Sequence, residues 1–484
     1  NQKRMKLPLF RLSIICFLLG ISIPITSQTV TVSKEISVKS DYAYDLFNMN
    51  NGNILMYRDK GSDQKFEVFD SDLQFLYEQR ITLESFRDTR IVEIIGTDSL
   101  VTIYYTFQFK QGSVLKCKNF LPDGTPRDTL TLATDDGDLF KKAMGSVVSE
   151  DHSKLVIYRY FDKNLHVFII DNRNKEVLQY SLLDKNNYEL KDGIKDVAIS
   201  NDGIVWLRMN SEFDSGHENN QLVFYNIPLG AEPNLIKIDF KDYFSPRMIL
   251  KFDNHNKNIA LAGLLELDEN ESDAYFVFRG PQIMSSTNLE IIPIPISDQM
   301  LYLANGKPDK PEEVIKDYYI KDFFFREDGG VLLIFEYEKV VYRRANYAGT
   351  RFYGDNLLGY SNMTDHYHEN LILINLNPDL TQNWEKLLFK KQYSQDDDGY
   401  FSSICTFITP SRLRFLYNDE IKNFSTVSEY VLDPFGNVER NSVLSTEYQD
   451  LRLRINDALQ LNNSEILVPS EKSGKLNLVK ISYH

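Results

Sequence analysis

The residues with the most evident chemistry lie between Lys339 and Gly354. This stretch has four basic residues and no acid, interleaved with aromatic residues; they are Lys339, Arg343, Arg344 and Arg351, with Tyr342, Tyr347, Phe352 and Tyr353. Arginine and tyrosine dominate binding hot spots because they combine rigid contact area with directed hydrogen-bond donors. We therefore predict a hairpin that binds a partner through Arg343, Arg344, Tyr347, Arg351, Tyr353 and Tyr367. The alternative is that the hairpin folds back on its own acidic surface and its aromatic residues cover the neighbouring strands.

His366 and His368 are the candidate metal ligands. They lie two residues apart, so on a strand both imidazoles would project from one face. Asp365 or Glu369 could complete a metal site, but two ligands on one strand without a second cluster are a weak signal. We interpret the two histidines as solvated hairpin residues and predict no metal site.

Two acidic turns are similar in composition to calcium-binding loops. Residues 396–399 read DDDG and residues 134–138 read TDDGD. Neither has the alternating ligands followed by a distant glutamate that an EF-hand loop requires. Because Asp and Gly also favour tight turns, we predict that these residues serve the turns themselves.

The sequence has no recognisable catalytic motif. It lacks the G-x-S-x-G and H-E-x-x-H patterns of hydrolases. The segment SNDGIVWL resembles the Asp-box turn of sialidase-type propellers, but Gly203 and Trp206 each fall one residue too early. The chain has so many carboxylates that a catalytic pair for glycoside hydrolysis cannot be identified from the sequence. We predict no catalytic residue and no cofactor, and the sequence favours a protein that is not an enzyme.

The elements that must position these residues form a repeat. Eight units each contain a polar turn, an apolar strand, a loop and a second strand; the strand pairs are NGNILMYRD with KFEVFDSD, SLVTIYYTF with SVLKCKNFLPDG, KLVIYRY with LHVFIIDN, NDGIVWLRM with QLVFYNI, NIALAGLLE with AYFVFRG, GGVLLIFEYE with NLILINLNPD, SRLRFLYND with SEYVLDPFGN, and SEILVPS with LNLVKISYH. Repeats of about 50 residues with several short strands are typical of β-propeller blades. The sequence predicts an all-β fold, a β-propeller of seven or eight blades.

Two strands near the ends of the chain favour a closed ring. The segments TVTVSKEISV and LNLVKISYH can pair with each other, which would hide edges that invite aggregation. We expect one propeller domain over residues 28–484, with a long hairpin insertion at about 338–369. The stretch around Pro308 is expected to form one or two helical turns.

The first residues and the charge balance indicate the compartment. Arg4 and Lys6 precede a mostly apolar run, and we predict a secretory signal peptide in residues 1–27 with cleavage after Ser27. Cys117 and Cys405 remain after cleavage, too few for a disulfide framework, which fits a bacterial envelope protein. The chain has 69 acidic and 54 basic residues, which argues against nucleic acid or an anionic membrane surface as partner. We expect export through the inner membrane to the periplasm or the outer-membrane or extracellular surface, and no integral membrane protein.

One stretch of the chain resembles a known group of proteins. Residues 323–423 contain DGGVLLIFEYE, a Tyr-containing insert, NLILINLNPD, NWEKLLFKKQ, DDDGYFSS and LYNDEIKN in that order. This order resembles uncharacterised secreted β-propeller-like proteins of Bacteroidota. The resemblance implies a propeller-like envelope protein with no known activity. The insert YEKVVYRRANYAGTRFYG departs from the pattern because it is less rich in tyrosine.

Three classes of function fit these observations. The leading hypothesis is a noncatalytic secreted β-propeller that acts as a protein-interaction or scaffold module in the bacterial cell envelope. The first alternative is a glycan-binding or glycan-cleaving propeller that uses the Arg/Tyr insert and carboxylates facing the ring axis. The second is a ligand-sensing propeller that works with a separate membrane partner. The partner is thus an envelope protein or a glycan, and the sequence does not define the oligomeric state.

Overall fold

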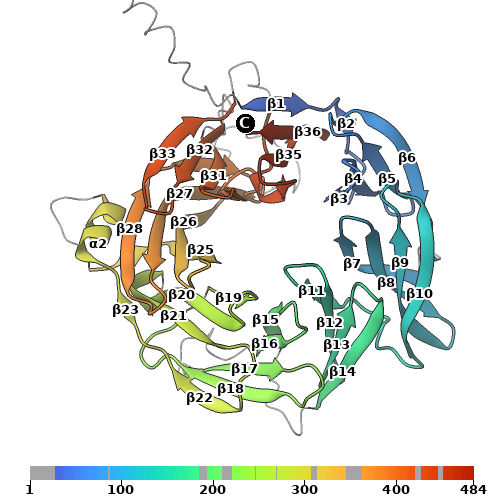
Figure 1. The fold of residues 1–484 in the computed structure, drawn as a ribbon, viewed down its shortest axis with the longest axis horizontal. Helices are drawn as coiled ribbons and strands as arrows, with labels where there is room; N and C mark the ends of the chain where they lie inside the picture. Colours follow the sequence, from blue (N-terminus) through green and yellow to red (C-terminus); the bar gives the residue numbers. More distant parts are fainter. Residues whose placement is uncertain are drawn as a thin grey trace, which may run out of the picture.

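The chain folds into a ring of β-sheets (Figure 1). This computed structural model describes residues 28–84, 88–184, 193–209, 221–245, 247–268, 270–306, 313–344, 362–419, 427–444 and 451–483. These residues form eight separate sheets of four or five strands, each sheet being one blade. The predicted all-β propeller is confirmed, with eight blades.

The first four blades follow one another along the chain. Their strands, innermost first, are β3 (Ala43–Asn48), β4 (Ile54–Asp59), β5 (Gln64–Phe69) and β6 (Phe75–Ile81) in blade 1; β7 (Thr89–Gly96), β8 (Val101–Phe109), β9 (Gly112–Phe120) and β10 (Pro126–Asp135) in blade 2; β11 (Gly145–Val148), β12 (Lys154–Phe161), β13 (Asn164–Asp171) and β14 (Glu176–Asp184) in blade 3; and β15 (Ile194–Ile199), β16 (Val205–Met209), β17 (Gln221–Ile227), β18 (Asn234–Asp239) and β22 (Thr287–Glu290) in blade 4. Strand β22 is parallel to β18, whereas the other pairs in these blades are antiparallel.

The other four blades complete the ring. Their strands are β19 (Met248–Asp253), β20 (Asn258–Asp268), β21 (Glu271–Pro281), β23 (Ile294–Pro295) and β24 (Ile315–Lys316) in blade 5; β25 (Tyr318–Phe325), β26 (Val331–Arg344), β27 (Asn362–Leu376), β28 (Gln382–Leu388) and β29 (Gln392–Gln395) in blade 6; β30 (Cys405–Ile408), β31 (Leu413–Asn418), β32 (Val427–Leu432) and β33 (Val438–Ser442) in blade 7; and β34 (Leu459–Gln460), β35 (Glu465–Lys472), β36 (Lys475–Ser482), β1 (Thr29–Val32) and β2 (Ile36–Ser37) in blade 8.

The predicted strand pairs are the second and third strands of each blade, counted from the ring axis. In β4, Leu55 and Met56 point to opposite faces of the sheet, and both are fully buried because a blade packs on each side. Phe66 on β5 and Ile103 on β8 belong to the same apolar cluster, which lies between blades 1 and 2. Each such buried side chain stabilises the ring by roughly 1.5–3 kcal/mol.

The ring closes in blade 8. Strand β1 pairs with β36 in antiparallel register from Thr29 opposite Ser482 to Val32 opposite Val479, and the two lie side by side in Figure 1. Segments from both ends of the chain therefore share one sheet, and the predicted closure is confirmed. The pairing covers the outer edge of β36, which would otherwise be open to pairing with another chain.

The helical turns expected around Pro308 are absent from residues 313–322, where the structure has the strands β24 and β25. The helix α2 (Asp298–Asn305) lies before Pro308, and a short 3-10 helix, η4 (Ile455–Asp457), precedes β34. Ser297 caps α2 by accepting a hydrogen bond from the backbone N–H of Met300, and Gly306 ends it at a φ of 61°. Residues 307–312 lie outside the described part of the chain, and β structure resumes at Ile315. The buried Met300 and Leu301 explain why the helix forms where it does.

None of the helices in the described residues is sufficiently long and apolar for a bilayer span. The predicted signal peptide, residues 1–27, lies outside the described residues.

Candidate functional site

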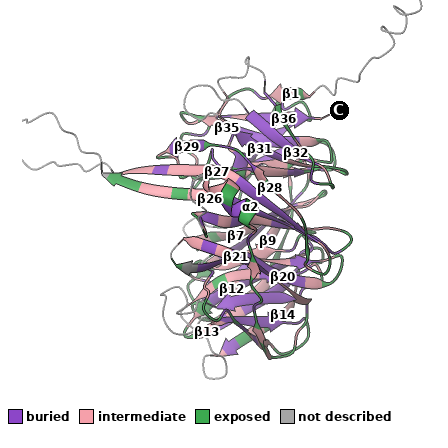
Figure 2. Cartoon of the chain, turned by 90° about the vertical axis from the view of Figure 1, so that its left-hand side faces the viewer, coloured by how far each residue is buried: buried purple, intermediate pink, exposed green. Residues whose placement is uncertain are grey.

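A long hairpin leaves the ring on one face. Strands β26 and β27 remain paired from Val331 opposite Leu376 to Arg344 opposite Asn362, and Figure 2 shows them projecting past the other blades. The innermost strand β25 starts at Tyr318 opposite Tyr337, so the last residues of β26 extend beyond it. Strand β29 pairs with β27 from His368 opposite Gln392 to Asp365 opposite Gln395, so only the last residues of β26 and the first of β27 extend as a two-stranded arm.

The structure describes part of the predicted binding set. The side chain of Arg343 is 51% exposed and forms an ion pair with the buried Asp365, donating to its Oδ1 at 2.6 Å. Tyr367 contacts the ring of Tyr393 at 5.1 Å, and the Tyr393 hydroxyl donates to Asp365 at 2.8 Å. Arg343 and Tyr367 are therefore brought together through Asp365 and Tyr393. Neighbouring Tyr342 is 79% exposed.

The other predicted binding residues are not described. Arg344 is the last residue of β26, and its side chain lies outside the described part of the structure. Tyr347, Arg351 and Tyr353 also lie outside the described residues. Their role stays a prediction.

A buried ionic cluster supports the root of the hairpin. Glu336 on β26 lies 2.6 Å from the ammonium nitrogen of Lys390, and their side chains are 4% and 0% exposed. Ser403 donates to Glu336 at 2.5 Å, and Gln392 accepts from Lys390 at 2.8 Å. Burial disfavours the charged carboxylate, but Lys390 and His368 hold the pKa of Glu336 well below its usual range. The root of the arm is a rigid, hydrogen-bonded polar core.

The two histidines lie beneath a loop. His366 and His368 face the same side of β27, as predicted. Both rings lie next to Gly399: a Cβ atom built on that glycine would be 3.5 Å from Nδ1 of His366 and 3.6 Å from Nε2 of His368. The prediction of a solvated side chain is wrong for His368, which is 12% exposed and lies 3.7 Å from the carboxylate of Glu336, and His366 is half-buried. Among the described residues, no group of three His, Cys, Asp or Glu side chains could hold a metal ion.

The covering loop, residues 396–403, includes the DDDG turn. Asp396 accepts from the backbone N–H of Thr364 at 2.8 Å, and Asp397 accepts from that of Gly399 at 3.1 Å. Asp397 also accepts from Arg452 of the approach to blade 8 at 3.0 Å. These carboxylates serve the turn and its neighbours, and the loop joins the hairpin root to blade 8.

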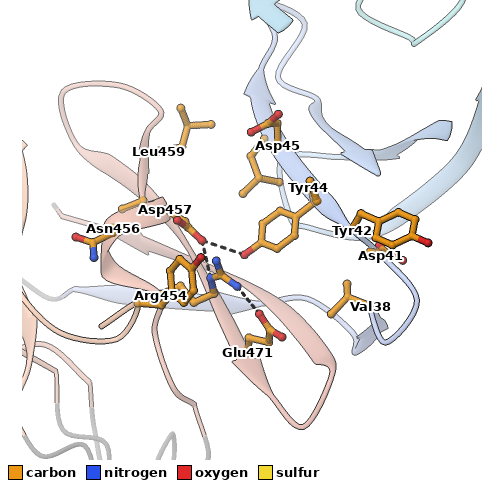
Figure 3. Close-up of a pocket in the computed structure, with 14 residues that line it drawn as sticks. Val38, Asp41, Tyr42, Tyr44, Asp45, Arg454, Asn456, Asp457, Leu459 and Glu471 are labelled. Carbon is orange, nitrogen blue, oxygen red and sulfur yellow. Dashed lines mark hydrogen bonds and ion pairs between the residues drawn. The ribbon is translucent and has the colours of Figure 1, made fainter. Parts of the chain in front are cut away.

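A pocket of about 600 Å³ opens between blades 8 and 1 (Figure 3). Arg454 at its centre donates to Asp457 and Glu471, both at 2.5 Å, and Tyr44 from β3 donates to Asp457 at 3.3 Å. The guanidinium of Arg454 also lies 4.5 Å from the ring centre of Tyr400, which belongs to the loop 396–403. The pocket and the hairpin root therefore share one loop.

Asp45 is the unusual residue of this pocket. It lies on the innermost strand β3 and is exposed, and within the described structure it forms neither a hydrogen bond nor an ion pair. Although water reaches its side chain, the surrounding atoms remove part of the hydration of its carboxylate, and this desolvation, together with the carboxylates of Glu93 and Asp457, raises the pKa of Asp45 to about 6. The sequence analysis missed this pocket, because its walls come from four separate stretches of the chain, residues 38–46, Tyr400, residues 454–459 and Glu471, that only the closed ring brings together.

Comparisons with known proteins find similar solved structures, but no family model and no curated protein matches the chain. The chain is similar to the Dos1 propeller, with 10% identity over 93% of this chain and 94% of that one, and a TM-score of 0.43. It is also similar to a Bacteroides vulgatus member of the DUF4221 family, with 9% identity over 86% and 99% of the two chains and a TM-score of 0.31. A Listeria monocytogenes protein of unknown role matches at 10% identity over 82% and 96%, with a TM-score of 0.40.

Its own eight blades define the chain as a β-propeller protein. Two features distinguish this propeller: an anchored hairpin, and an acidic, tyrosine-lined pocket on the same face.

Proposed function

We propose that this propeller is a noncatalytic protein-interaction or scaffold module of the bacterial cell envelope, and that it docks its partner on the face that carries the hairpin. The observation that supports this best is the anchored arm itself: β26 and β27 extend past the blade, while Glu336 and Lys390 fix their root. A preorganised arm loses little conformational entropy on binding, so more of its contact energy appears as affinity.

The surface of the arm suits a partner of opposite charge. Tyr342 is 79% exposed, which gives a rigid aromatic contact that the fold does not use for packing. The insert from Lys339 to Gly354 is basic on an acidic chain. Lys339 and Arg343 pair with Asp317 and Asp365, so the proposal depends on the charge of Arg344 and Arg351. Complementary charge raises association rates and selects partners, so we expect an acidic surface on the partner.

The compartment is part of the proposal. The apolar segment after Arg4 and Lys6 is typical of a signal peptide. The resemblance of residues 323–423 to secreted Bacteroidota proteins points the same way. We therefore propose secretion through the inner membrane. The glycan-binding or glycan-cleaving and the ligand-sensing alternatives stay predictions from the sequence.

Affinity capture with a matched control tests the proposed interface. The tagged full-length protein is expressed in its native host and isolated in mild detergent, and a stoichiometric partner is identified by mass spectrometry. The test variant changes Tyr342, Arg344, Tyr347 and Arg351 to Ala and keeps Arg343, because Arg343 neutralises the buried Asp365. The control is Phe435→Ala, which removes an 82% exposed aromatic side chain on blade 7.

We expect the wild type and the Phe435→Ala control to retain the partner and the quadruple variant to lose it, with an unchanged thermal midpoint. Retention of the partner by the quadruple variant would show that the hairpin is not the interface. A protein isolated without a stoichiometric partner would contradict the scaffold role.

A further inference from the structure

The pocket between blades 8 and 1 holds more negative charge than its own residues balance. Asp457 and Glu471 share Arg454, and Asp41 at the rim is neutralised by Arg58, whose Nε lies 2.6 Å from it. Asp45 is the fourth carboxylate of the lining, and no cation of the described structure pairs with it. The unbalanced charge faces a cavity large enough for a small ligand or a side chain.

The neighbours of Asp45 strengthen this imbalance. Glu93 on β7 and Asp457 in η4 are the charged groups that act on it, and both are acidic. The carboxylate of Glu93 accepts hydrogen bonds from the backbone N–H of Ile94 and the hydroxyl of Ser146, and neither brings a positive charge. A cation at this position would interact favourably with all three carboxylates.

The pocket already shows how its walls hold a cation. Arg454 lies over the rings of Tyr400 and Tyr44, at 4.5 and 5.4 Å, while two carboxylates accept its N–H groups. This combination of aromatic faces and acceptors is the general solution for a guanidinium or ammonium ion. Tyr400 of the lining is 45% exposed and keeps free surface, whereas Tyr42 points away from Arg454 and Asp45 (Figure 3).

We propose that this pocket is a binding site for an organic cation, an ammonium or guanidinium group, with Asp45 as its counter-ion and Tyr400 as its aromatic face. A bare metal ion does not fit as well, because the described residues form no group of three metal-ligating side chains. The cation belongs either to a free amine or to a Lys or Arg side chain of a protein. The site does not depend on the hairpin being an interface.

The probes test whether a positive charge on the ligand is required for binding. Isothermal titration calorimetry of the full-length mature protein compares N-acetylarginine amide with N-acetylcitrulline amide, which has nearly the same shape but no charge. Agmatine represents a free amine, and a short peptide with one central arginine represents a protein side chain. Asp45→Asn is the test variant, and Asp72→Asn, in the turn between β5 and β6, is the matched surface control.

We expect the arginine amide to bind and the citrulline amide to bind at least about tenfold more weakly, since the interaction is with charge. Asp45→Asn should weaken arginine binding by a similar factor, and Asp72→Asn should leave it unchanged. Tighter binding of the peptide than of agmatine identifies a protein side chain as the source, and the reverse identifies a small amine.

Three results would overturn the proposal: no heat of binding with any cationic probe, equal binding of the arginine and citrulline amides, or unchanged binding in Asp45→Asn. Binding of a neutral oligosaccharide in place of the cations would also overturn it and would favour a glycan site. Because the probes are small, their failure is independent of the partner capture that tests the hairpin.

Discussion

The buried pair Glu336–Lys390 allows a quantitative test of how the hairpin is anchored. The Lys390→Met variant keeps most of the side-chain volume but leaves the carboxylate of Glu336 in a site where it is 4% exposed. Removing one partner of a buried ion pair costs about 3–5 kcal/mol, because an uncompensated charge stays in a medium of low polarity. Ser403 still donates to Glu336, so we expect the loss to lie toward the lower end of that range.

The double variant Glu336→Gln/Lys390→Met should recover at least half of this loss, because it removes both charges. The difference between the double variant and the summed single variants is the coupling energy, and we expect about 2 kcal/mol or more. The pH dependence has a defined sign. Since the pKa of Glu336 is lowered in the folded protein, its contribution is present above the unfolded value of about 4.3 and is lost as pH falls below it.

Urea unfolding followed by tryptophan fluorescence measures these values. The chain has two tryptophans, Trp206 on β16 of blade 4 and Trp384 on β28 of blade 6. Single-tryptophan variants report the two blades separately, and coincident transitions are required before one free energy is assigned. A Lys390→Met variant within about 1 kcal/mol of the wild type, or additive single variants, would refute the inference that this ion pair supports the root of the hairpin.

Three further predictions follow from other parts of the ring. Deletion of residues 28–32 removes β1 and exposes the outer edge of β36. We expect a lower midpoint of thermal unfolding, and concentration-dependent association through this edge, measured by size-exclusion chromatography with light scattering. A deletion variant that stays monomeric and equally stable would contradict the role of β1. The folded-state pKa of Asp45 is about 6, above its unfolded value, so the charged carboxylate destabilises the fold above that pH. The Asp45→Asn variant should therefore raise the thermal midpoint slightly at pH 8 but not at pH 4. A lower midpoint at pH 8 would show that Asp45 has a stabilising partner. Burial raises the pKa of the thiols of Cys117 to about 11 and of Cys405 to about 12, so both should react with iodoacetamide only after unfolding, and labelling of the native protein, detected by mass spectrometry, would refute this.

The sequence predicted best the middle strands of the blades, because neighbouring blades bury both of their faces and these strands are therefore continuously apolar. Strand β32, Val427–Leu432, is buried at every position, and it appears in the sequence as an apolar run between turns. The innermost strands give weaker signals because one side of each faces the ring axis. Strand β34 has two residues, Leu459 and Gln460, and no pattern in the sequence distinguishes it from a loop.

The hairpin could be predicted from the sequence, whereas the pocket could not. The hairpin was predicted because its residues are contiguous, and the reversal of charge between Lys339 and Gly354 is visible in the sequence. The pocket depends on Tyr44, Tyr400 and Arg454, which are far apart in the chain and meet only through the packing of blades 8 and 1. The solvated state predicted for His368 failed for a related reason, since the loop that covers it lies about thirty residues later in the chain, a separation that strand periodicity does not register.

The loop 396–403 links the two features of this face. Gly399 covers His366 and His368 at the hairpin root, Asp397 accepts from Arg452, and Tyr400 lies beside Arg454 in the pocket. The hairpin root and the cation pocket therefore rest on one short segment whose own hydrogen bonds fix it on both sides. A partner that displaced this loop would break the contacts of both sites at once, whereas a partner that left it in place could bind the arm and insert a basic side chain into the pocket. The second arrangement keeps every buried ion pair of the root intact, and so it is the one that this face favours.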